Sequence, residues 1–157
     1  MDNYLLLKML HILSAVVLTG TGAGIAFFMF MANRSNNLAV MAITARHVVL
    51  ADWIFTTPAI LIQCVSGVLL MNKLGYSYSS KWFLMVLALF LFIGLCWLPV
   101  VFIQYKLKSA AEQSLATGIL APQFKALMRL WTALGIPAFI AILIIFWLMI
   151  FKPFALV

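Results

Sequence analysis

The chain has 157 residues, of which 67% are hydrophobic and only 8% are charged, and its mean hydropathy is +1.19. A soluble domain is about half apolar and about one quarter charged, and one of this size cannot bury so much apolar surface, so the composition excludes a soluble protein. The net charge of +7 does not indicate nucleic-acid binding, because the basic residues lie between apolar segments and form no stripe with interleaved aromatic residues.

Four segments are long and apolar enough to cross a bilayer, which takes about 20 residues: 4–31, 48–71, 82–104 and 130–151. The first run is too long for a signal peptide, and no small-residue cleavage site precedes the polar stretch NRSNN, so we expect a retained span. Turn-rich stretches separate the spans. The sequence therefore predicts an all-α, integral membrane four-helix bundle with one domain over residues 1–157. We expect a multi-pass protein in the lipid bilayer of the cell inner membrane.

The basic residues predict which side of the membrane each loop faces. Six of them lie in or beside the first and third loops, and four lie in the second loop or near the termini. Because basic loops stay in the cytoplasm, we expect these first and third loops to be cytoplasmic and both termini to be periplasmic. The six are Arg34, Arg46, Lys106, Lys108, Lys125 and Arg129, and the four are Lys8, Lys73, Lys81 and Lys152.

The first span contains two ionisable residues, Lys8 and His11, about one helical turn apart. Lys8 can extend to the membrane interface, whereas His11 lies deeper. Two interpretations of His11 are open: a structural histidine that is hydrogen-bonded between helices, or an axial ligand of haem iron. Further along the span, the small residues of LTGTGAG predict that the backbone of another helix comes close.

A haem iron held by His11 would need its second ligand from elsewhere. The only other histidine, His47, cannot supply it, because in an antiparallel hairpin it lies about 33 Å from His11 at about 1.5 Å per residue. A methionine sulfur can take this position, and Met71, Met85 and Met149 are expected at the depth of His11. Methionine also fills gaps between apolar side chains, so a packing role for these residues is the alternative.

The second span carries a polar stripe on one helical face. Asp52, Thr56, Gln63 and Ser66, with Ala59 between them, follow at spacings of three and four residues. An ionisable residue inside a span usually pairs with another group or belongs to a functional site. The hydroxyl and amide groups can equally join helices by hydrogen bonds. Within this stripe, Pro58 predicts a kink.

Further unusual residues lie at the cytoplasmic ends of the last two spans. We expect Asp52 to form an ion pair with Arg129, or else with Arg46, and the prolines near this depth to bend the helices around a cavity. Gly118 is expected to end the third helix and Pro122 to start the fourth. The aromatic residues near the interfaces are expected to be membrane anchors. The residues in question are Trp97, Pro99, Gln104, Trp131 and Pro137 for the cavity, and Tyr76, Tyr78, Trp82 and Trp131 for the anchors.

Several stretches of the chain resemble a bacterial family of predicted integral membrane proteins, domain of unknown function 2269. They are LKMLHILSAVVLTGTGAG, ADWIFTTPAILIQ, GLCWLPVVFIQ, RLWTALGIPAF and the terminal KPF. The resemblance extends over all four spans and implies a helical membrane fold. It implies no particular reaction.

A more distant likeness concerns the Lys-x-x-His pattern of Lys8 and His11. This pattern is similar to the first helix of HemJ-type protoporphyrinogen oxidases and of copper-resistance D-type membrane proteins. The HemJ-type proteins bind b-type haem through such a histidine. The likeness therefore implies that His11 is an axial ligand of haem b and that Lys8 belongs to the same site.

Three functions remain open from the sequence. The first is a small membrane redox protein with haem b, in which His11 and a methionine such as Met85 or Met149 hold the iron. The second is a small transporter or metal-handling protein that uses the Asp52 stripe. The third is a non-catalytic accessory subunit bound to a membrane partner protein or to further copies of itself.

Overall fold

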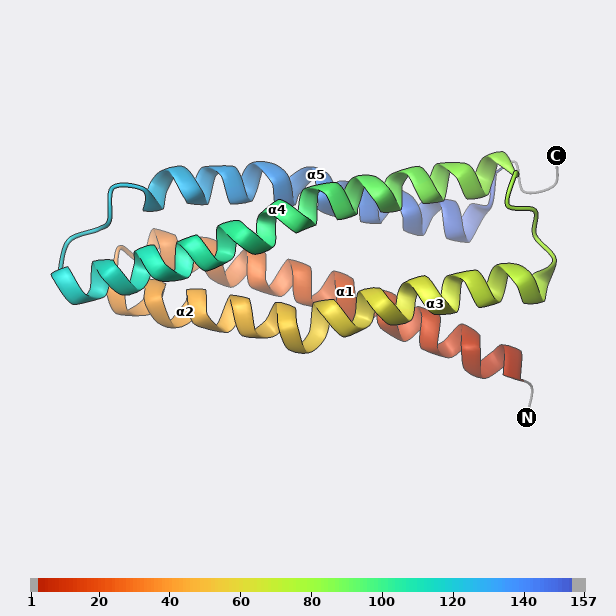
Figure 1. Ribbon diagram of the computed structural model, residues 1–157, viewed down its shortest axis with the longest axis horizontal. Helices are drawn as coiled ribbons and strands as arrows, with labels where there is room; N and C mark the ends of the chain where they lie inside the picture. The colour runs from red at the N-terminus through yellow and green to blue at the C-terminus, as the bar shows by residue number, and fades with distance from the viewer. Residues whose placement is uncertain (1–2, 154–157) are drawn as a thin grey trace.

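The computed structural model describes residues 3–153 and forms a bundle of four long helical rods (Figure 1). Each rod is long and apolar enough to cross a membrane, and the described residues contain no strand. Both described ends lie at the same end of the bundle (Figure 1), as the sequence predicts. The elements are α1 (Asn3–Arg34), α2 (Leu38–Ala51), the π-helical segment η1 (Asp52–Thr56), α3 (Thr57–Leu74), α4 (Lys81–Thr117) and α5 (Phe124–Phe151), with α2, η1 and α3 joined in one rod.

Local sequence signals explain where the rods begin and end. The side chain of Asn37 accepts hydrogen bonds from the backbone N–H groups of Ala39 and Val40 and so caps α2. Gly75 and Gly118 follow α3 and α4 with positive φ angles of 66° and 72°, a conformation that glycine adopts without strain. Gly118 therefore ends the third rod as predicted. The next helix begins at Phe124.

The rods are longer than the spans expected from apolarity alone. Helix α4 has 37 residues, which corresponds to about 55 Å at about 1.5 Å per residue, whereas the hydrocarbon core of a bilayer is about 30 Å thick. Its last turns, with Lys106, Lys108 and Glu112, therefore continue beyond the membrane. The second rod likewise begins at Leu38, ten residues before the apolar run 48–71.

The four rods pack together most closely near the first and third loops. A buried cluster there joins α1, α2, α4 and α5, and its largest members include Met29, Leu107 and Phe124. Toward the other end of the bundle, α1 packs on α3 while α4 packs on α5. A smaller buried cluster of Met71, Trp82 and Leu148 joins α3, α4 and α5 near the second loop.

Two tryptophans that the sequence suggested as lipid-facing anchors are buried instead. Only 4% of Trp82 is exposed, and its indole N–H donates a hydrogen bond to the carbonyl of Leu148. Trp131 is 7% exposed and belongs to the cluster near the first and third loops. Both residues fall at the ends of apolar runs, where a membrane anchor and a core residue have the same sequence signature.

The glycines of α1 do not mark the close helix contact expected from LTGTGAG. A Cβ atom built on Gly20, Gly22 or Gly24 would have no neighbour within 4 Å. The close approach occurs at Gly67 of α3, where a Cβ would lie 3.3 Å from the ring carbon Cε1 of His11. The contact between α1 and α3 is therefore centred on His11.

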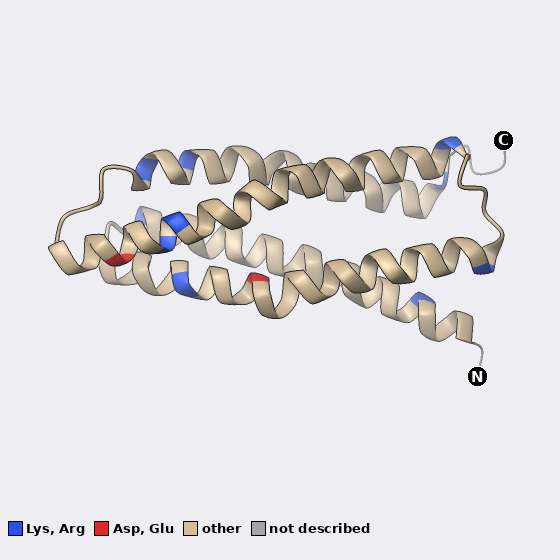
Figure 2. Ribbon diagram, in the orientation of Figure 1, with Lys and Arg blue, Asp and Glu red and all other residues tan. Residues whose placement is uncertain are grey.

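The outer surface matches a lipid environment. Large apolar side chains are exposed along every rod, while Lys and Arg lie toward the two ends of the bundle (Figure 2). A surface with this distribution of charge is stable only when its middle band is in hydrocarbon.

Candidate functional site

A π-helical segment, η1, interrupts the second rod at Asp52, between the helices labelled α2 and α3 in Figure 1. The backbone N–H of Thr57 donates to the carbonyl of Asp52, five residues back, and the Thr57 hydroxyl donates to the same carbonyl at 3.0 Å. Pro58 follows directly, and it has no N–H to donate to Ile54. The expected kink therefore takes the form of one wide turn, which is a feature often found at functional sites.

The carboxyl group of Asp52 is buried and only half satisfied. Its side chain is 5% exposed, and its Oδ1 accepts a hydrogen bond of 2.7 Å from the Thr56 hydroxyl. Its Oδ2 makes no hydrogen bond of good geometry with a described residue, although the Gln104 side chain lies beside the carboxyl group. An unpartnered buried carboxyl oxygen is costly, so this atom needs a ligand, a water molecule or a proton.

Three further buried polar atoms without a partner in the described chain lie on α4, which packs on this rod, and on α5, which packs on α4. They are the indole Nε1 atoms of Trp97 and Trp131 and the amide Nε2 of Gln104. Asp52, Trp97 and Gln104 line one cavity of about 150 Å³ between the second rod and α4. A single water needs only about 10–15 Å³ by this measure, so the cavity has room for several waters or a small molecule.

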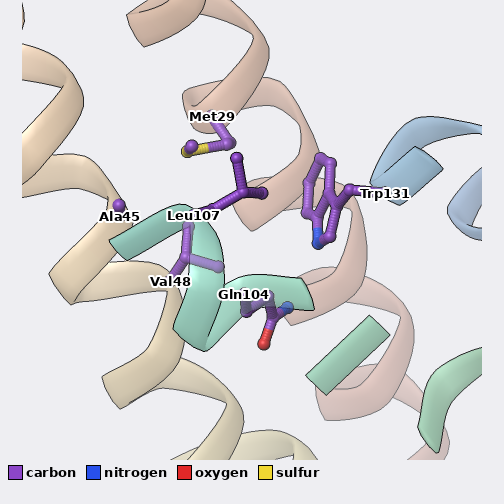
Figure 3. Close-up of a pocket in the computed structure, with 6 residues that line it drawn as sticks. All are labelled: Met29, Ala45, Val48, Gln104, Leu107 and Trp131. Atoms are coloured by element: carbon purple, nitrogen blue, oxygen red, sulfur yellow. The ribbon is translucent and has the colours of Figure 1, made fainter. Parts of the chain in front are cut away.

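Gln104 connects this cavity with a second, tighter pocket (Figure 3). The tight pocket is lined by Met29, Ala45, Val48 and Leu107 together with Gln104 and Trp131, and it has no room for a water molecule. In Figure 3, the indole nitrogen of Trp131 lies on the edge of the ring that faces the side of the pocket occupied by Gln104. Gln104 therefore lines both the cavity at Asp52 and the pocket at Trp131, and its side chain lies beside the Asp52 carboxyl group.

The larger cavity is bordered on its outer side by an aromatic pair. Trp53 of η1 and Tyr105 of α4 both line the cavity, and the Trp53 indole N–H donates a hydrogen bond to the Tyr105 hydroxyl. Both side chains are exposed on the outside of the bundle, at 58% and 43%. Opening this one hydrogen bond would widen the way from the surface to Asp52.

The ion pair that the sequence suggested for Asp52 is not formed. Arg129 is exposed on α5, and Arg46 pairs with Glu112 of α4 at 2.6 Å instead. Arg46 lies six residues before Asp52, about 9 Å along the helix, and is level with the part of α4 that extends beyond the membrane. Within the described chain, Asp52 therefore has no cationic partner.

His11 occupies a second polar cluster, between α1 and α3. Its Nδ1 lies 2.8 Å from the Ser66 hydroxyl, and its Nε2 lies 3.1 Å from the amide nitrogen of Gln63. Ser14 donates to the Gln63 amide oxygen, and Ser66 donates to the carbonyl of Ile62. A neutral ring with its proton on Nδ1 satisfies all of these contacts. Gln63 and Ser66, the two members of the predicted polar stripe that lie on α3, thus bind His11.

The other residues suggested for a haem site lie apart from this cluster. Lys8 is exposed, with its Nζ 5.9 Å from the centre of the Tyr4 ring. Met85 is 43% exposed, and Met149 packs beside the cluster of Met71, Trp82 and Leu148. Iron at His11 would have to displace Gln63 from Nε2 or Ser66 from Nδ1. Within residues 3–153, no three His, Cys, Asp or Glu side chains gather to hold a metal ion.

Sequence reasoning found half of each cluster. It identified His11, Asp52, Thr56 and Gln63, but it missed Ser14, Gly67 and the hydrogen bond between Trp53 and Tyr105. No sequence signal pointed to those three, because each acts through a contact with a distant part of the chain. Of the five residues expected around a cavity, Trp97 and Gln104 line it, Trp131 lines the tighter pocket, and Pro99 and Pro137 line neither.

The family comparison agrees with this architecture. A family model described as predicted integral membrane protein, DUF2269, matches residues 5–153. The chain therefore belongs to this family and is an integral, multi-pass membrane protein. Neither a curated protein nor a solved structure gives a significant match.

Proposed function

We propose that this member of the DUF2269 family is a small transporter of the inner membrane that binds a polar solute at Asp52. One observation supports the proposal above all: Asp52 and Gln104 both line one cavity, and the buried Oδ2 of Asp52 and Nε2 of Gln104 have no hydrogen-bond partner among the described residues. Such groups inside a span are expensive to maintain and usually belong to an ion or substrate path.

Two features of the backbone support the same function. The π-helical turn at Asp52 and the proline that follows it form a weak point in the second rod, where a change of hydrogen bonding needs little rearrangement. The tight packing near the first and third loops, with pairs of helices toward the other end, is compatible with relative movement of the pairs. A binding site at such a junction can be exposed to one side at a time.

A comparison of three strains tests this proposal. The full chain, its Asp52→Asn variant and a Glu112→Gln control are expressed at matched levels in a bacterium that lacks its own copy. Growth is then measured across arrays of small polar and cationic compounds. We expect tolerance of at least one compound to change several-fold with the wild type and with Glu112→Gln but not with Asp52→Asn. Identical profiles for all three proteins would contradict transport through Asp52.

An accessory role makes a different prediction for the same samples. A subunit would be recovered from mild detergent with a defined membrane partner, and the loss of Asp52 would leave that association intact. Asp52-dependent tolerance recovered without a stoichiometric partner would favour the transporter.

A further inference from the structure

We infer that the ligand of the Asp52 cavity is an organic cation with an apolar body, such as an aryl or alkyl ammonium, and that it enters from the lipid between η1 and α4. This inference rests on the proposed function and specifies its substrate class and its route. Four observations carry it: the charge of the site, the chemistry of its walls, the direction of its opening and its depth in the membrane.

The charge of the site favours a cation. Among the described residues, Asp52 is the only acidic side chain that lines the cavity, and the counterions that the sequence suggested, Arg46 and Arg129, are paired elsewhere or exposed. An ionised carboxyl group in an apolar site needs a cation beside it, so Asp52 keeps its proton in the empty cavity and releases it when a cation binds. An ammonium group supplies that missing charge, whereas an anionic ligand would be repelled by the same carboxylate.

The walls of the cavity favour an apolar body over a sugar or another polyhydroxylated solute. Most of the lining is aliphatic or aromatic, and Trp53 and Trp97 present indole rings within it. Aromatic rings attract cations in addition to burying apolar surface. The Tyr105 hydroxyl keeps its own proton while it accepts from Trp53. Gln104 Nε2 and Trp97 Nε1 are buried donors without a partner among the described residues, and the three donors together are too few for a sugar. Waters that accompany the ammonium group can accept hydrogen bonds from the two buried donors. The apolar lining consists of Val49, Leu98, Val101 and Phe102.

The cavity opens toward the surface that faces lipid. Asp52 at its base is 5% exposed, while Phe102 at its border is 68% exposed. Trp53 and Tyr105 lie at the same border and close it with their hydrogen bond. A ligand that leaves the lipid therefore reaches the carboxyl by passing this pair, and the polar loops are not on the route.

The depth of the opening matches the place where amphiphilic cations gather. Asp52 lies six residues, about 9 Å, inward of Arg46 along the rod, and tyrosine and tryptophan side chains prefer the membrane–water interface. A cation with an apolar body also partitions to this interface, with its charge toward the headgroups and its body among the acyl chains. The site can thus take its ligand directly from the layer in which the ligand is concentrated.

The test uses benzylammonium as the probe and benzyl alcohol as a neutral probe of nearly the same shape. Binding to the detergent-purified full chain is measured by calorimetry and by quenching of tryptophan fluorescence. We expect Asp52→Asn to weaken benzylammonium binding by about tenfold or more and to leave benzyl alcohol binding within about twofold. Asp52→Glu, which keeps the charge, should retain benzylammonium binding and so covers the case in which the asparagine variant misfolds.

A second variant tests the proposed entry route between η1 and α4. Tyr105→Phe removes the hydroxyl that accepts from Trp53 and leaves the ring in place, so we expect benzylammonium to associate several-fold faster, with its affinity changed less than its rate. Phe102→Tyr, at the same border, is the matched control and should not raise the rate. An unchanged association rate in Tyr105→Phe would overturn entry past this pair.

The outcomes separate this inference from the proposed function. If benzylammonium and benzyl alcohol lose affinity equally in Asp52→Asn, or if benzylammonium does not bind, the substrate class is wrong. Transport through Asp52 then still stands, provided that growth on another compound depends on Asp52. If no compound shows a dependence on Asp52, both proposals fall together.

Discussion

At the residue scale, His11 shows how a deep histidine in a span can be satisfied by its neighbours. Both ring nitrogens have polar partners on α3, Ser66 and Gln63. The sequence could place Gln63 and Ser66 on one helical face, because spacing determines the face. It could not show that this face meets His11, because the register of α1 against α3 depends on the whole bundle.

The contact between Gly67 and His11 yields a stability prediction. In Gly67→Ala the new methyl group would lie 3.3 Å from His11 Cε1, and the ring cannot easily yield while Ser66 and Gln63 hold it. Gly94→Ala, where no atom lies within 4 Å of the new methyl, makes the same change of helix propensity without a clash. We expect Gly67→Ala to be less stable than Gly94→Ala by about 1 kcal/mol or more, measured by thermal unfolding in one detergent. Equal melting temperatures would show that the ring is not held tightly.

Haem binding at His11 stays a prediction from the sequence, and a spectrum tests it. The hydrogen bonds of His11 lead us to expect no Soret band in the purified protein after expression with ample haem. The spectrum would be recorded oxidised and then reduced with dithionite. A Soret band that sharpens on reduction and disappears in His11→Ala would show instead that Gln63 or Ser66 gives way to iron.

At the scale of the elements, the π-helical segment is the feature that the sequence indicated least clearly. Pro58 predicted a disturbance in the second rod, but a kink, a break and a π turn all relieve the same missing hydrogen bond. Packing decides among these three forms. A π turn holds one residue more than an α-helical turn, and this extra residue lets α2 face α4 while the polar stripe of α3 stays against α1. Helix propensity alone carries no information about how the helices pack against one another.

A pair of single-residue deletions tests this role of the π turn. Deleting the exposed Phe55 from η1 would convert the wide turn to an ordinary helical turn and keep both flanking helices in register. Deleting the exposed Leu61 from the regular helix α3 would rotate Gln63 and Ser66 by about 100°, given about 3.6 residues per turn. We expect the first variant to fold and the second to lose much of its stability, judged by yield and melting temperature in detergent. Similar losses in both would mean that the π turn is not an extra residue in this sense.

At the scale of the whole molecule, the four-helix membrane architecture followed from the sequence, because each span has a strong and continuous apolar signal. The positions at which the rods begin and end were predicted less accurately. Helices α2 and α4 extend past the apolar runs, since residues such as Lys106 and Glu112 support a helix outside the membrane as well as a loop. The partners of Asp52 could not be predicted, because several arginines lie at similar depths and only packing selects among them.

The orientation of the bundle is a further prediction at this scale. The excess of basic residues near the first and third loops places them in the cytoplasm. In a background with Cys64→Ala and Cys96→Ala, a membrane-impermeant maleimide should label Ser79→Cys, in the second loop, on intact cells. It should label Asn36→Cys, in the first loop, only after the cells are broken. The reverse pattern would place the termini in the cytoplasm.

Both proposals depend most on Asp52, a buried carboxyl group that has no cationic partner among the described residues and that we infer to be reachable from the lipid. The most direct measurement is mass spectrometry of the purified protein after treatment with dicyclohexylcarbodiimide, an apolar reagent that partitions into the membrane and adds to a protonated carboxyl group. A water-soluble carbodiimide serves as the comparison, since it should reach the half-buried carboxyl of Glu112, which pairs with Arg46 on the part of α4 beyond the membrane.

We predict that the apolar reagent adds one label at Asp52, that Asp52→Asn abolishes the label, and that Glu112→Gln leaves it unchanged. Benzylammonium added beforehand should slow the labelling. A wild-type protein that takes up no apolar label at Asp52, while Glu112 still reacts with the water-soluble reagent, would contradict the account, because Asp52 would then be either paired or sealed from the membrane.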